Sequence, residues 1–185
     1  MIKKLALIIG FIICLSSCGK DYVYRIEGEL SNLEDQTVYA VFEKDNYKVV
    51  DTVACTKPGQ FQIDQHEAGF HCVTIFFADK EHWVTAYLEP GETVKITGDA
   101  NSPLLLQVKG GRTNDKLTAF KKKIAPLLTE LTNLSNSLNS KDLNDTIEET
   151  DIAARLANVN MQLSEEAIRY VKENPNEEAS VVLIQ

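Results

Sequence analysis

Two apolar runs lie in the middle of the chain: His71-Cys-Val-Thr-Ile-Phe-Phe77 and His82-Trp-Val-Thr-Ala-Tyr-Leu88. Both are rich in β-branched and aromatic residues, which favour strands, and we expect both to be central strands of a sheet. Six further segments of strand character occur at residues 22–30, 36–43, 47–55, 60–64, 93–97 and 104–109. Turns such as Glu89-Pro-Gly-Glu92 separate them, because Pro presets φ and Gly supplies a positive φ. About eight short strands without helices between them predict an antiparallel β-sandwich or barrel-like domain over residues 22–111.

From residue 112 the pattern changes to that of helices. Apolar residues recur at alternating spacings of three and four, which is typical of one helix face: Leu117, Phe120, Ile124, Leu127, Leu131, Leu134 and Leu138. Pro126 lies within this stripe and is expected to kink or divide the helix. A second helix is expected from about Thr146 to Glu173, before Asn174-Pro-Asn176. The fold class is therefore α+β, with a helical hairpin or linker region over residues 112–185.

The N-terminus has the features of a bacterial lipoprotein signal. Lys3 and Lys4 precede an apolar segment at residues 5–15, which is shorter than the about 20 residues that span a membrane. The following Leu15-Ser-Ser-Cys-Gly19 resembles the lipobox, in which a peptidase cuts before a cysteine that carries the lipid. We expect residues 1–17 to be a removed signal peptide, Cys18 to be lipidated and residues 18–21 to form a tether. The other interpretation is ordinary secretory cleavage near Ser17.

The same segment and the charge of the chain bear on its location and partners. An Asp directly after the lipidated cysteine would resemble an inner-membrane retention signal, but this chain has Gly19 there. This difference favours attachment to the outer membrane, with the protein facing the periplasm. Lys20-Asp21 is faintly similar to surface-export signals of some Bacteroidetes lipoproteins, so exposure at the cell surface stays open. The chain has 19 Lys and Arg against 27 Asp and Glu, a net charge of −8. This balance argues against nucleic acid and against electrostatic docking on anionic lipid, so the lipid anchor is the expected link to the membrane.

Two cysteines, Cys55 and Cys72, remain once Cys18 is lipidated and the signal peptide is removed. The cell envelope is oxidising, so a disulfide between them is permitted. The alternative is two separate buried thiols that act as small apolar residues. The chain has no Cys-x-x-Cys motif and therefore no thioredoxin-type redox centre of its own.

Few side chains are arranged for catalysis or metal binding. His66, His71 and His82 do not have the spacing of a helical zinc site. Glu89 and Glu92 flank a Pro-Gly turn and are expected to be solvated, although paired carboxylates can serve acid–base chemistry. We therefore predict no catalytic residue, no bound metal and no cofactor.

Two further features leave alternatives open. Gly110-Gly111 before Arg112 either cradles an anion at a helix N-terminus or forms a flexible joint between strand and helix. Four aromatic residues either line a ligand groove or pack in the core: Phe76, Phe77, Trp83 and Tyr87.

Several short motifs follow one another in order: Ile26-Glu-Gly28, Asp51-Thr-Val53, Gly59-Gln-Phe-Gln-Ile63, Tyr87-Leu-Glu-Pro-Gly-Glu92, Ile96-Thr-Gly98 and Gly110-Gly-Arg-Thr-Asn-Asp-Lys-Leu117. Together with the lipobox they resemble the DUF4369 domain of Bacteroidetes lipoproteins, a β-rich module of unknown function. The resemblance covers Tyr22 to roughly Ala119. In that family the module often precedes a thioredoxin-like thiol–disulfide oxidoreductase domain. No such domain follows in this chain, so no redox role is carried over to any residue.

Three functional hypotheses follow. The leading one is a non-catalytic, lipid-anchored protein of the cell envelope that acts as an interaction or positioning module with a protein partner. The competing one is the N-terminal half of a thioredoxin-like thiol–disulfide oxidoreductase whose catalytic domain is absent from this chain. The third is a binder of small ligands that uses the sandwich interior or the aromatic strands.

Overall fold

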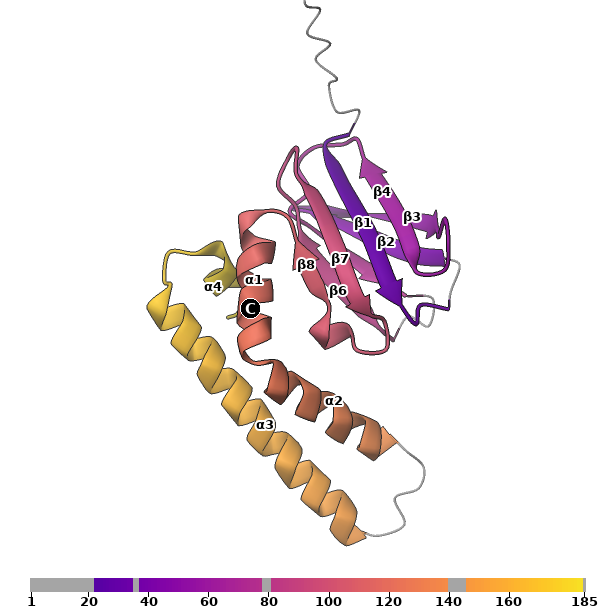
Figure 1. Ribbon diagram of the computed structural model, residues 1–185. Coiled ribbons are helices and arrows are strands. Elements are labelled where there is room, and N and C mark those ends of the chain that lie inside the picture. Colours follow the sequence, from indigo (N-terminus) through magenta and orange to yellow (C-terminus); the bar gives the residue numbers. More distant parts are fainter. Residues whose placement is uncertain (1–21, 35–36, 78–80, 140–145, 185) are drawn as a thin grey trace, which may run out of the picture.

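The computed structural model describes residues 22–34, 37–77, 81–139 and 146–184. Eight strands form two four-stranded sheets that pack face to face, and helices follow them (Figure 1). The predicted α+β fold is thereby confirmed. Cys18 and the rest of the predicted signal and tether lie outside the described residues.

The first sheet has the strand order β4-β1-β7-β8 and the second has the order β3-β2-β5-β6. Their bounds are β1 Tyr24–Ser31, β2 Thr37–Lys44, β3 Tyr47–Ala54, β4 Gln60–Gln65, β5 Cys72–Phe76, β6 Trp83–Tyr87, β7 Thr93–Asp99 and β8 Gln107–Lys109. Alternate residues face the core between the sheets, as a two-residue period requires; Ile26, Phe42 and Ile75 are each 2% exposed or less.

Two details differ from the expectation. The strands β1 and β7 pair in parallel, with Ile26 opposite Val94, although every other strand pair described is antiparallel. Residues 104–109 form a 3-10 turn, η1 (Pro103–Leu105), before the short β8. Side-chain patterns mark which face of a strand is buried, but they do not encode the direction of its neighbours.

The second apolar run forms an edge strand and not a central one. The run at 71–77 becomes β5, which lies between β2 and β6, whereas the run at 82–88 becomes β6 at the end of the sheet. Its apolar character has another cause: helix α1 (Arg112–Lys123) lies across this edge and covers it (Figure 1).

Helix α1 joins the two sheets through two buried polar side chains. Asn114 accepts a hydrogen bond from the Tyr87 N–H at 2.8 Å and donates to the Tyr87 carbonyl at 2.7 Å. Thr118 accepts from the Val108 N–H at 3.1 Å and donates to the Val108 carbonyl. Tyr87 belongs to the edge of one sheet and Val108 to the edge of the other. Each side chain therefore satisfies a strand edge that would otherwise lie open.

The remaining helices form the expected hairpin. The first predicted helix divides at Ile124 into α1 and α2 (Ala125–Asn139), so that Pro126 falls in the first turn of α2, where proline is tolerated. Helix α3 (Thr146–Glu173) packs against α2 through Leu134, Ile152 and Val159. A short helix, α4 (Glu178–Val182), docks on α1. None of the described helices combines the length and the apolar character needed to cross a membrane.

The strap formed by α1 generates a stability prediction. Asn114→Leu keeps the side-chain volume but leaves partly buried backbone groups of Tyr87 and Gly110 without partners, so the free energy of unfolding should fall by about 1–3 kcal/mol. Urea denaturation measures the change. Asn160→Leu, on an exposed position of α3, serves as the control and should stay within about 0.5 kcal/mol. Equal stability of the two variants would show that the strap bonds contribute nothing.

Candidate functional site

An apolar cavity of about 360 Å³ lies where β6, η1, α1, the start of α2 and α4 meet. This volume is within the usual range of ligand pockets. Two of its lining residues are large apolar side chains that stay exposed: Trp83 is 54% and Leu104 40% exposed. The other residues used below are Thr85, Tyr87, Asn114, Leu117, Thr118, Lys121, Ile124, Leu128 and Leu183.

One face of α1 and its continuation into α2 forms a wall of the cavity. Its residues recur at spacings of three and four, which places them on a single helix face: Asn114, Leu117, Thr118, Lys121, Ile124 and Leu128. Of the described residues that line the cavity, Lys121 alone is charged. Burial lowers the pKa of Lys121, and its Nζ lies 3.4 Å from the Leu106 carbonyl oxygen.

The cavity continues onto the outer face of the second sheet. Tyr39 of β2 stands opposite Phe76 of β5, and Phe76 stands opposite Trp83 of β6. The ring centroids of Phe76 and Trp83 are 6.1 Å apart. The next row across the sheet consists of Val50, Val41, Thr74 and Thr85. We call these two rows the outer face; Trp83 and Thr85 belong both to it and to the cavity.

A family model described as a domain of unknown function, DUF4369, matches residues 24–117. This chain belongs to the DUF4369 family. The match includes every described strand and the first half of α1, with Asn114. Comparison with curated proteins and with solved structures gives no match.

The Pro-Gly turn of this DUF4369 protein caps α1. Glu89 accepts a hydrogen bond from the Arg112 N–H at 2.7 Å, so the anion at this helix N-terminus is a carboxylate of the chain itself. Gly110 and Gly111 have φ of 99° and 80°, and a Cβ on Gly110 would overlap the Thr93 carbonyl oxygen. The glycine pair is thus a tightly specified joint. The sequence analysis considered Glu89 and the glycines separately, because 20 residues lie between Glu89 and Gly110.

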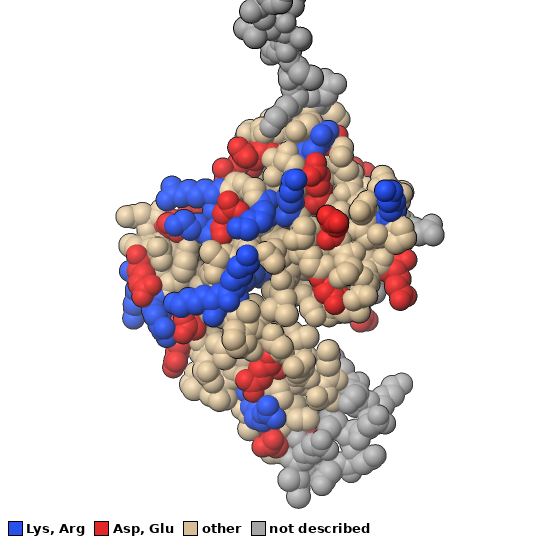
Figure 2. Space-filling model, viewed as in Figure 1, with Lys and Arg blue, Asp and Glu red and all other residues tan. Residues whose placement is uncertain are grey.

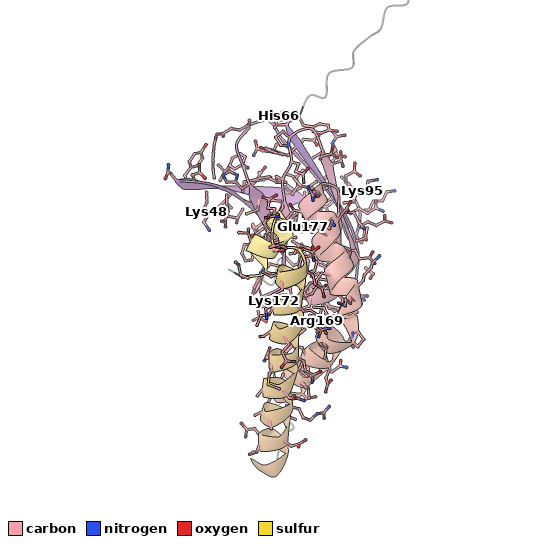
Figure 3. All side chains as sticks on the ribbon, turned by 90° about the vertical axis from the view of Figure 1, so that its left-hand side faces the viewer. Lys48, His66, Lys95, Arg169, Lys172 and Glu177 are labelled. Carbon is pink, nitrogen blue, oxygen red and sulfur yellow. The ribbon has the colours of Figure 1, made fainter. Side chains whose placement is uncertain are left out.

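The histidines do not form a common site. His71 and His82 lie at opposite ends of the β5–β6 pair, where they bond to Leu88 and Phe77 through their backbones. Figure 3 shows His66 at the end of the sandwich opposite to α2. The described residues contain no group of three or more His, Cys, Asp or Glu that could hold a metal ion.

The permitted disulfide is not formed. Cys55 follows the end of β3 that pairs with Thr37, whereas Cys72 pairs with Glu43 at the other end of β2. The length of a strand therefore separates two cysteines whose Cα atoms would need to lie within about 7 Å. No bond joins them, and burial raises the pKa of the Cys72 thiol.

The aromatic residues Phe76, Phe77, Trp83 and Tyr87 lie in different environments. Phe77 is 2% exposed and belongs to the core, as the packing alternative predicts. Trp83 and Tyr87 line the cavity, as the groove alternative predicts, and Phe76 lies beside Trp83 on the outer face. Sequence reasoning missed Lys121 and Leu104, because a lysine at a helical spacing and a leucine near a turn carry no signal of a cavity.

Helix α4 closes one side of the cavity and is held by a carboxylate between two helices. Glu177 accepts hydrogen bonds from Lys116 at 2.8 Å and from the Tyr170 hydroxyl at 2.9 Å, and Figure 3 shows it between α1 and the C-terminal helices. The bond to Lys116, then that to Tyr170, lowers the pKa of Glu177. Burial, together with Glu177, raises the pKa of Tyr170 to about 12.

These contacts predict that acid loosens α4. The pKa of Glu177 is lower in the folded chain than in the unfolded one, so its stabilisation is complete above the ordinary glutamate range and is lost as the pH falls through the lowered pKa. Trp83, the single tryptophan of the chain, lines the cavity with Leu183 next to α4, and its emission should shift in that pH range. In Glu177→Gln the shift should already be present at neutral pH. Glu173→Gln, on an exposed carboxylate of α3, should behave as the wild type; an identical response of both variants would contradict this role of Glu177.

Proposed function

We propose that this DUF4369 protein is a non-catalytic, lipid-anchored protein of the bacterial cell envelope that binds or positions a partner protein through the outer face of its second sheet. The observation that carries the proposal is an apolar face that the described helices border only at β6. Residues 38–42 of β2 and 72–77 of β5 are apolar or nearly so at every position, a pattern typical of strands covered on both faces. In this fold the other sheet covers one face only.

The exposure and composition of the outer face support protein binding. Val50 is 66% and Trp83 54% exposed, and neither apolar side chain gains from contact with water. Contiguous exposed apolar surface marks interaction sites, and aromatic side chains are enriched at the centres of protein interfaces. Threonines at Thr74 and Thr85 add hydroxyl groups without charge.

The lipid anchor of the proposal rests on the N-terminal sequence. Residues 1–17 would be removed, Cys18 would carry the lipid, and residues 18–21 would connect it to β1. Gly19 favours the outer membrane with the protein facing the periplasm, and a surface location stays open. The resemblance of the lipobox and of Lys20-Asp21 to Bacteroidetes signals supports an origin in that group.

Replacing the acceptor cysteine tests the anchor. Cys18→Ala should leave the precursor uncut and unable to incorporate labelled palmitate, because the thiol is the group that is alkylated. The readout is the intact mass of the protein and its label in membranes. Ser17→Ala keeps a small residue before the cleavage point and should mature normally. Normal maturation of Cys18→Ala would contradict lipidation.

Photo-crosslinking in intact cells tests the contact surface. A photoreactive amino acid at Val50, on the outer face, should give a discrete adduct with one protein, which mass spectrometry then identifies. The same group at Gln62, an exposed position on β4 of the other sheet, is the matched control and should give none. Absence of an adduct at Val50, or the same adduct at both positions, would contradict a partner on this face.

The thioredoxin-related hypothesis stays a prediction. An in-frame Cys-x-x-Cys segment in the gene downstream of Gln185 would support it, and the outer face would then be a candidate seat for that domain. The Val50 adduct distinguishes the two hypotheses. A crosslink within the same chain would support the thioredoxin-related hypothesis, whereas a crosslink to a second protein would support the partner hypothesis.

A further inference from the structure

Lys121 has no acidic partner among the described residues, unlike most of the basic residues around it. Figure 2 shows Lys and Arg side chains gathered over α1 and the neighbouring strands of this acidic chain. Most of them are paired with carboxylates: Lys109 with Asp115 at 3.5 Å, and Lys116 with Glu177 at 2.8 Å. Among the described residues, the Lys121 ammonium has one polar neighbour, the Leu106 carbonyl oxygen at 3.4 Å.

The surroundings of Lys121 are those of a partly buried group. It lies on the cavity-facing stripe of α1, one turn from Leu117 and Thr118 and one turn from Ile124. The next residue, Lys122, is exposed and does not line this cavity, although both lysines and Leu106 line a smaller pocket beside it. Burial lowers the pKa of Lys121, and no carboxylate of the described residues forms an ion pair with this ammonium. A partly buried charge without a counter-charge is less well solvated than an exposed one, so a bound anion would be stabilised here.

We propose that the cavity binds a fatty acid, with its carboxylate on Lys121 and its aliphatic tail among the apolar side chains. The tail would contact Leu117, Ile124, Leu128 and Leu183, and the exposed Leu104 and Trp83 would border the entrance. This inference goes beyond the proposed protein contact and does not depend on it.

The composition of the wall selects this class of ligand. A single ammonium matches one negative charge, whereas the cavity lining holds no second cation for a dianion such as a phosphate monoester. The side chains of Asn114 and Thr118 are already hydrogen-bonded to the backbone of the strand edges, so few polar groups remain to bind a sugar or a nucleotide. An apolar body with one terminal anion is the chemistry that remains.

Paired ligands that differ in the head group test the proposal. The chain from residue 18 with Cys18→Ser keeps every described residue and carries no lipid of its own. Decanoate and decanol are titrated below their micelle concentrations, and Trp83 emission and calorimetry are recorded. Decanoate should bind about tenfold more tightly or better, because a charge-assisted bond adds to the same tail contacts. Heat without a change in Trp83 emission would place the binding elsewhere and overturn the proposal.

Matched lysine variants locate the charge. Lys121→Gln should lower decanoate binding to the level of decanol and leave decanol binding unchanged, while Lys122→Gln should leave both unchanged. The urea midpoint of each variant shows that it is folded. Equal binding of the two ligands to the unsubstituted protein, or equal losses in the two variants, would overturn the proposal. A short peptide with an apolar C-terminal residue and a free carboxylate, if it binds more tightly than decanoate, would overturn the assignment to fatty acids.

Discussion

The arrangement of the whole molecule depends on two side chains that take the place of a strand. A β-sandwich of four plus four strands has open edges, and the backbone groups at those edges need partners. Asn114 supplies them for Tyr87 and Thr118 supplies them for Val108, one on each sheet. Because the two residues are four apart on one helix, α1 must lie across the open side of the sandwich. The cavity and the position of α4 follow from that placement.

The family match ends within the strap, between Asn114 and Thr118. The matched segment stops at Leu117, just after Asn114 has closed the edge of the second sheet. Glu89, in the turn between β6 and β7, caps the helix that carries Asn114. The Pro-Gly turn, the glycine pair and the asparagine are therefore parts of one joint, although they stand apart in the sequence.

The sequence predicted the structure best where the spacing of apolar residues alone determines the type of element. Strand character located the eight strands, although the last one, β8, is shorter than expected, and the spacing of three and four located α1 and α2 with the division near Pro126. The parallel pairing of β1 with β7 could not be predicted, because it depends on how distant segments meet. The edge position of β6 was missed for the same reason: Val84 and Ala86 face the core, while Trp83 and Thr85 are apolar or neutral because of the helices beside them. Lys121 is one of three consecutive lysines, and nothing in the sequence distinguishes it from Lys122 and Lys123.

The position of β1 in its sheet has a mechanical consequence. This strand is the first described element of the chain, and it is hydrogen-bonded along its length to β4 on one side and to β7 on the other. A force applied along the axis of β1 loads both ladders in shear. Residues Arg25 to Glu29 are paired on both sides, and their bonds must give way together instead of opening one after another from an edge. The sandwich therefore resists a pull that is directed along β1.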